Sequence, residues 1–168
     1  MEVFSHLLAS NERQTFEFFV VGLKDVLETD VDERELLYTA SVLAHHAQVS
    51  TQAARDVPAP TSLVTLFDQF VLDQSVHHDG TLLETAGAQC LLLAGFFERQ
   101  MKARHSIRYY SQLGSTFFRR AGALTSGRTR GALLDSVGQH FEPWRARCAR
   151  LSRDLDTQRL LIGRQSLD

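Results

Sequence analysis

Residues 86–97 form an apolar stretch in which Gln89 is the exception. A helix that is apolar on all sides has to be covered by other helices, because it has no face to present to water. The stretch is shorter than the roughly 20 residues that a helix needs to span a bilayer. Thr81 and Glu84 precede it with the spacing of a capping box. We therefore expect a soluble protein in which a central helix covers residues 81–104.

Apolar residues recur at steps of three and four along the rest of the chain, a spacing that places them on one face of a helix. The groups are Phe16, Phe19, Val20, Leu23, Val26 and Leu27; Leu36, Ala40, Leu43 and Ala47; Leu63, Leu66, Phe67, Phe70 and Val71; and Ile107, Tyr110, Leu113, Gly114, Phe117, Ala121 and Leu124. Asp32, Ser62 and Ser106 can cap three of these helices, and Pro58 and Pro60 mark a connector. The sequence thus predicts an all-α fold, a single domain over 1–168 with about six helices packed around the central one.

The most regular pattern lies near the C-terminus, where steps of three and four alternate in the manner of a bundle helix or coiled coil. Its members are Leu134, Val137, Phe141, Trp144, Cys148, Leu151 and Leu155. Pro143 can kink such a helix or divide it in two, and we favour a kink because the phase continues across the proline. We expect this seam to pack inside the bundle. The alternative is a homodimer through Leu134, Val137, Phe141, Trp144 and Leu151.

Charge divides the chain in two. Residues 1–98 hold 4 basic and 15 acidic side chains, whereas residues 99–168 hold 14 basic and 5 acidic ones. Such asymmetry is a composition-level hint of an anionic partner, and the two regions can equally pair with each other within one fold. Residues 99–130 contain basic side chains and aromatic rings but no acid.

This basic segment is the candidate site. We expect binding through Arg99, Arg104, Arg108, Tyr109, Arg119 and Arg120. The preferred hypothesis is a non-enzymatic adaptor or regulatory protein that binds a protein partner through this edge. An alternative is a sensor that binds a nucleotide, a nucleic acid or another anion there, because arginines and aromatic rings bind phosphates and stack on bases. Internal pairing with the acidic region is the structural interpretation of the same residues.

Motifs for catalysis or metal binding are absent from the sequence. The chain has no His-x-x-x-His, Glu-x-x-His, Cys-x-x-Cys or Gly-x-Ser-x-Gly. A metal-dependent enzyme that uses His77, His78 and Asp79 is the remaining alternative. Cys90 and Cys148 fall at positions that we expect to be buried, where thiols are inert. We therefore assign no catalytic residue, no metal and no cofactor, and we expect a cytoplasmic protein.

One segment carries a resemblance. Leu92, Leu93, Ala94, Gly95, Phe96 and Phe97 are followed by an Arg-rich turn and then by Ser106, Tyr109, Tyr110, Leu113, Gly114, Ser115, Phe118 and Ala121. This pattern resembles a motif of small bacterial helical proteins. The resemblance implies a bacterial origin and an all-α fold, and it brings no catalytic residue to this chain. From the residues themselves, we expect Gly95 and Gly114 to let their two helices approach each other closely, with the tyrosines anchoring the turn between them.

Overall fold

The computed structural model describes residues 12–52, 78–103 and 105–165, with side chains described for 12–48, 78–103 and 105–157. Every regular element in these ranges is helical, which confirms the all-α fold. The helix expected after Ser62 and the connector at Pro58 and Pro60 lie outside the described residues. Two compact units make up the chain, Met1–Val57 with Arg150–Asp168, and Pro58–Ala149. The single domain expected over 1–168 stays a prediction.

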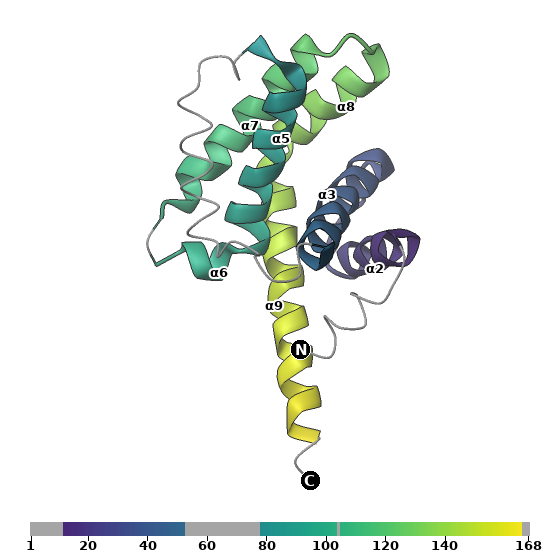
Figure 1. Ribbon diagram of the computed structural model, residues 1–168, viewed down its shortest axis with the longest axis vertical. Coiled ribbons are helices and arrows are strands. Elements are labelled where there is room, and N and C mark those ends of the chain that lie inside the picture. The colour runs from purple at the N-terminus through teal and green to yellow at the C-terminus, as the bar shows by residue number, and fades with distance from the viewer. Residues whose placement is uncertain (1–11, 53–77, 104, 166–168) are drawn as a thin grey trace. The chain divides into compact units, whose positions relative to one another are not determined.

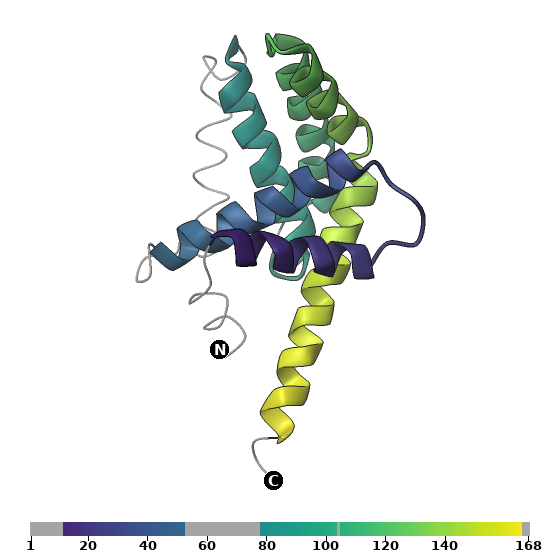
Figure 2. The same cartoon turned by 90° about the vertical axis from the view of Figure 1, so that its right-hand side faces the viewer.

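The first unit contains a hairpin of two helices, α2 (Glu12–Asp25) and α3 (Glu33–Gln52), which lie side by side (Figures 1 and 2). Asp32 begins α3, because its carboxylate accepts a hydrogen bond from the Arg34 backbone N–H at 2.8 Å. This cap was predicted. The expected apolar faces supply the buried side chains Phe19, Leu23, Leu36, Ala40 and Leu43.

The second unit is built on α5 (Gly80–Leu91), η2 (Leu92–Phe96), α6 (Glu98–Met101), α7 (Ile107–Leu124), α8 (Arg128–Gln139) and the start of α9 (Phe141–Gln165). Helix α7 packs against both α5 and α8 (Figure 1). The fully buried side chains of this unit include Leu83, Leu91, Leu93, Met101, Phe118, Leu134, Val137, Phe141 and Trp144. The apolar stretch therefore does lie in a core, as expected.

The prediction of one continuous helix over 81–104 is wrong in two details. Asp79, not Thr81, is the N-cap, and its side chain accepts from the backbone N–H groups of Thr81 and Leu82 at 2.9 and 3.1 Å. The α-helix also ends at Leu91 and continues as the π-helical segment η2, in which the Phe97 N–H donates to the Leu92 carbonyl at 2.8 Å.

Glycines let the helices of this unit approach closely. Gly114 of α7 meets the apolar helix as predicted, since a Cβ there would lie 2.8 Å from the Cβ of Cys90 in α5, whereas Gly95 faces α9 instead. A Cβ atom on Gly95 would lie 3.0 Å from the Cβ of Cys148 in α9, and one on Gly114 would overlap the Phe141 ring. The sequence did not point to a third approach. A Cβ on Gly122 of α7 would lie 2.6 Å from the Gly131 carbonyl oxygen of α8, so these two backbones are nearly in contact.

The C-terminal seam is divided rather than kinked. Helix α8 ends at Gln139 and α9 begins at Phe141, with His140 between them. Pro143 has no N–H to donate to the Gln139 carbonyl, and its ring would clash there, so the helix breaks and the proline falls in the first turn of α9. The expectation of a kink is therefore wrong, although Phe141 and Trp144 keep their predicted places in the core.

Candidate functional site

Helix α7 carries most of the predicted site. It begins at the cap Ser106, whose hydroxyl oxygen accepts a hydrogen bond from the Tyr109 N–H at 3.2 Å. Its buried face consists of Tyr110, Ser111, Gly114, Phe117, Phe118 and Ala121. The helix contains no acidic residue, so the face that remains in contact with water is neutral or basic. Helix α7 therefore presents its cations outward.

The structure brings four of the six predicted residues together on the exposed side of α7. Arg108 and Arg119 lie eleven positions apart, close to three full helical turns, so they share one face about 16 Å apart along the axis. Tyr109 and Arg120 each come one position after these arginines, so they form a second row along the helix beside the first. We call Arg108, Tyr109, Arg119 and Arg120 the arginine face. Arg99 lies exposed on α6, and Arg104 is outside the described residues.

Arg108 and Arg119 of the arginine face are held weakly by the described part of the chain. Arg119 forms an ion pair with Asp135 of α8 at 3.6 Å, with side chains 60% and 42% exposed. Exposed pairs of this kind contribute little to stability. Arg108 forms no hydrogen bond or ion pair with any residue that the structure describes. Tyr109 is 50% exposed and packs edge-to-face against the buried Tyr110, with ring centroids 5.2 Å apart.

Other arginines of the basic region point to internal acids. Three ion pairs join residues 99–168 to residues 1–98, namely Arg130–Glu84 at 2.6 Å, Arg145–Glu98 at 3.4 Å and Arg150–Glu28 at 2.8 Å. Some of the basic side chains of residues 99–168 are therefore paired with acidic side chains of residues 1–98, as the structural interpretation of the sequence expected.

A groove with several polar side chains in its lining includes Arg108. Its lining residues are Ile107, Arg108, Ser111, Gln112, Ser115, Gly138, Gln139, Phe141 and Glu142. The Ser111 hydroxyl donates to the Glu142 carboxylate at 2.6 Å, and the Ser115 hydroxyl donates to the Gly138 carbonyl at 2.7 Å. These bonds use both hydroxyl protons inside the chain. The guanidinium of Arg108 and the amide of Gln112 are left to interact with a bound group.

The wall of this groove is fixed by Arg145, which sequence reasoning missed. Its guanidinium donates to both carboxylate oxygens of Glu142 at 2.7–2.9 Å, and to the Ala94 carbonyl at 3.1 Å. The Arg145 and Ser111 hydrogen bonds hold the pKa of Glu142 below its ordinary value. The Glu142–Arg145 pair has a local spacing of three positions, but its links to Ser111 and to the Ala94 carbonyl span 31 and 51 positions, so the sequence does not point to the whole network.

The thiols and histidines give no centre for catalysis among the described residues. Cys90 and Cys148 are buried and free, and burial raises the pKa of Cys148 to about 12, so this thiol stays protonated. His78 is exposed next to Asp79, which is occupied as a helix cap, and His77 lies outside the described residues. Burial lowers the pKa of His46, which favours its neutral form.

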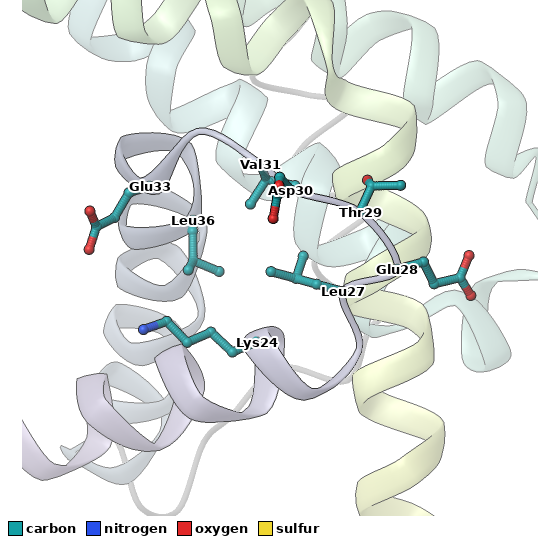
Figure 3. A pocket seen from close by; sticks show the side chains of 8 residues that line it. All are labelled: Lys24, Leu27, Glu28, Thr29, Asp30, Val31, Glu33 and Leu36. Atoms are coloured by element: carbon teal, nitrogen blue, oxygen red, sulfur yellow. The ribbon is translucent and has the colours of Figure 1, made fainter.

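A second hollow lies at the turn between α2 and α3 (Figure 3). Its lining residues are Lys24, Leu27, Glu28, Thr29, Asp30, Val31, Glu33 and Leu36. Figure 3 shows Glu28 and Glu33 at opposite sides of it, so the carboxylates do not converge. Within the described part of the chain, no group of three or more metal-binding side chains forms a metal site.

The residues suggested for a homodimer are covered within the chain itself. Leu134, Val137, Phe141, Trp144 and Leu151 are each 4% exposed or less. We therefore do not propose a dimer through them. In the ranges that the structure describes, none of the helices combines the length and the apolar character needed to cross a membrane.

Comparison of the chain with protein-family models, with curated proteins and with solved structures gives no match. The resemblance of residues 92–121 to small bacterial helical proteins therefore stays a prediction.

Proposed function

We propose that this chain is a non-enzymatic adaptor or regulatory protein of the bacterial cytoplasm, which binds an acidic protein partner through the arginine face. The observation that carries the proposal is the exposure of Arg108, Arg119 and Tyr109 on a helix without acidic residues. Arginine and tyrosine are enriched among the residues that dominate protein interfaces. A face of this charge also speeds the encounter with an acidic partner.

The burial of the other aromatic rings favours a protein partner over a nucleic acid. Tyr110, Phe117 and Phe118 are 4%, 3% and 0% exposed. Single-stranded nucleic acids bind to successive exposed rings on which bases stack. Tyr109 is the one aromatic side chain of α7 that remains exposed. One exposed ring cannot stack on several successive bases, whereas several cations can pair with the carboxylates of a folded acidic protein.

Photo-crosslinking in living cells tests the proposal. A benzophenone amino acid replaces Gln112, which lies exposed between Arg108 and Arg119, and the matched control carries it at Ser41, exposed on α3. We expect the Gln112 probe, but not the Ser41 probe, to capture one dominant acidic protein. The R108Q/R119Q/R120Q variant should lose this product. Capture of a species sensitive to nuclease, or equal capture from both positions, would contradict a protein partner at this face.

Binding of a small anion in the groove that Arg108 lines is a second candidate, favoured because Arg108 forms no hydrogen bond or ion pair with any described residue. Citrate and inorganic phosphate are suitable probes. If the groove binds such an anion, the probe should raise the melting temperature of the wild type and leave R108Q unchanged. Equal shifts in the two proteins would exclude a site at Arg108 and leave the protein-partner proposal intact.

A further inference from the structure

The first unit contains a groove between α2 and the C-terminal part of α9. Its residues are distant in the sequence from the arginine face, and its charged side chains are acidic rather than basic. Its lining residues are Gln14, Glu17, Phe18, Val21, Gly22, Asp25, Val26, Leu151, Asp154 and Leu155. Val21 is 59% exposed, the highest exposure of any large apolar side chain among the described residues. An apolar side chain so open to water at the wall of a groove is typical of a binding surface.

The sequence of α2 explains the groove. Thr15, Phe19 and Leu23 make the buried face of this helix. Phe18, Val21 and Gly22 follow the same steps of three and four on a second face. Gly22 lets α9 approach, because a Cβ there would lie 2.9 Å from a methyl group of Leu151. The two helices thus form the walls of this largely apolar groove, which we call the channel.

The rim of the channel is acidic. Asp25 and Asp154 are exposed, and neither forms a hydrogen bond or ion pair with any residue that the structure describes. Glu17 lies beside them and pairs with the exposed Arg13 at 3.0 Å. No lysine or arginine is found among the described lining residues. An apolar channel with unpaired carboxylates along its edge is complementary to an apolar stripe flanked by cations.

We propose that this channel binds an amphipathic helix of a second protein, with large apolar residues at helical spacing and lysines or arginines beside them. Helix-in-groove recognition uses such a stripe, with anchors at positions i, i+3, i+4 and i+7. The inference does not depend on the arginine face. Together, the two surfaces give one chain a site for a basic helix and a site for an acidic protein, which is the arrangement of an adaptor.

Fluorescence anisotropy of the full chain with a labelled peptide tests this inference. The probe is a helix of leucine and lysine of about 18 residues, or five turns, with the leucines on one face. One comparison peptide has glutamate in place of lysine, and another has the same composition in scrambled order. We expect only the amphipathic lysine peptide to bind. Equal binding of the scrambled peptide would overturn the proposal, because it would reduce the effect to charge alone.

Variants of the protein locate the peptide. V21R places a cation in the channel at an exposed position and should weaken binding at least about tenfold. D25N/D154N should weaken binding about threefold to tenfold, because two exposed charge pairs are lost. The control E12Q/E33Q removes two exposed charges of the same unit outside the channel and should leave binding unchanged.

Two further outcomes would overturn the proposal. One is unchanged affinity of V21R and D25N/D154N when circular dichroism shows that both are folded. The other is a wild-type dimer in sedimentation experiments that V21R converts to a monomer, with no peptide binding to either protein. That result would assign the channel to a second copy of this chain.

Discussion

Arg145 and Arg119 have different surroundings, although both belong to residues 99–168, where basic side chains are in excess. The Arg145 side chain is 13% exposed and donates to Glu142, Glu98 and the Ala94 carbonyl. The Arg119 side chain is 60% exposed and meets one half-exposed carboxylate at 3.6 Å. The difference shows that the arginines of residues 99–168 fall into two groups, those that point into the fold and those that point to solvent. Arg145, which points inward, joins helices, whereas Arg119, which points outward, keeps most of its side chain in contact with water.

Removal of Arg145 should cause the largest loss of stability. R145M keeps an apolar stem but removes the Arg145 hydrogen bonds to Glu142, Glu98 and the Ala94 carbonyl. We expect the free energy of unfolding to fall by about 3 kcal/mol. The matched variant R119M should lose less than about 0.5 kcal/mol, because its pair is exposed. Urea denaturation measures both. Equal losses in the two variants would break the distinction between inward and outward arginines.

The inward side of α7 can be tested at Gly122. G122A forces a methyl group to within 2.6 Å of the Gly131 carbonyl and 2.9 Å of the Asp135 nitrogen, both backbone atoms that cannot rotate away. We expect a loss of about 2 kcal/mol from overpacking. The control G80A meets its nearest atom at 3.5 Å and should be close to neutral. Thermal unfolding compares the two, and a neutral G122A would show that α7 and α8 are not held so closely.

Acid should weaken the inward network. The hydrogen bonds from Arg145 and Ser111 lower the folded-state pKa of Glu142 from its ordinary 4.5. Stability from this group is therefore present above the unfolded pKa and is lost as the pH falls through the folded one. Between about pH 5 and about pH 3, the wild type should lose more stability than E142Q. The lowered pKa of Asp32 contributes to both proteins and cancels. Parallel pH profiles would show that Glu142 is not coupled to Arg145.

Neutralising the arginine face should have the smallest effect on stability. R108Q/R119Q/R120Q replaces exposed side chains, and we expect a change below about 0.5 kcal/mol in the free energy of unfolding. The control R13Q/R34Q/R153Q removes the same charge from exposed positions of α2, α3 and α9 and should behave alike. Chemical denaturation at low and high salt checks both variants. A large loss in the first variant alone would mean that the arginine face is part of the internal framework.

The sequence predicted those features that depend on nearest neighbours along the chain. The spacing of Tyr110, Phe117 and Ala121 correctly gave the buried face of α7, and Asp32 and Ser106 were recognised as caps. The exposed positions of Arg108 and Arg119 follow from the same periodicity, because what is not on the buried stripe faces water.

The features that were missed depend on distant partners. Ser111 is not among the predicted apolar positions of α7, yet it is buried and its hydroxyl donates to Glu142, 31 positions away. The apolar residues of the π-helical segment did not predict it. Its Ala94 carbonyl accepts a hydrogen bond from Arg145 of α9, and such a distant donor cannot be recognised from the local sequence. Pro143 left two outcomes open, and periodicity could not decide between them, since a kinked and a divided helix keep the same buried positions.

The central claim is that the outward arginines of α7 bind an acidic protein. The most direct test is a titration of the protein captured at Gln112 against the wild type, R108Q/R119Q/R120Q and the charge-matched R13Q/R34Q/R153Q. The account predicts that only the first variant weakens binding, by at least about tenfold, with the loss in the dissociation constant shrinking as salt rises. Equal affinity of all three proteins, or equal weakening in both variants, would contradict the claim.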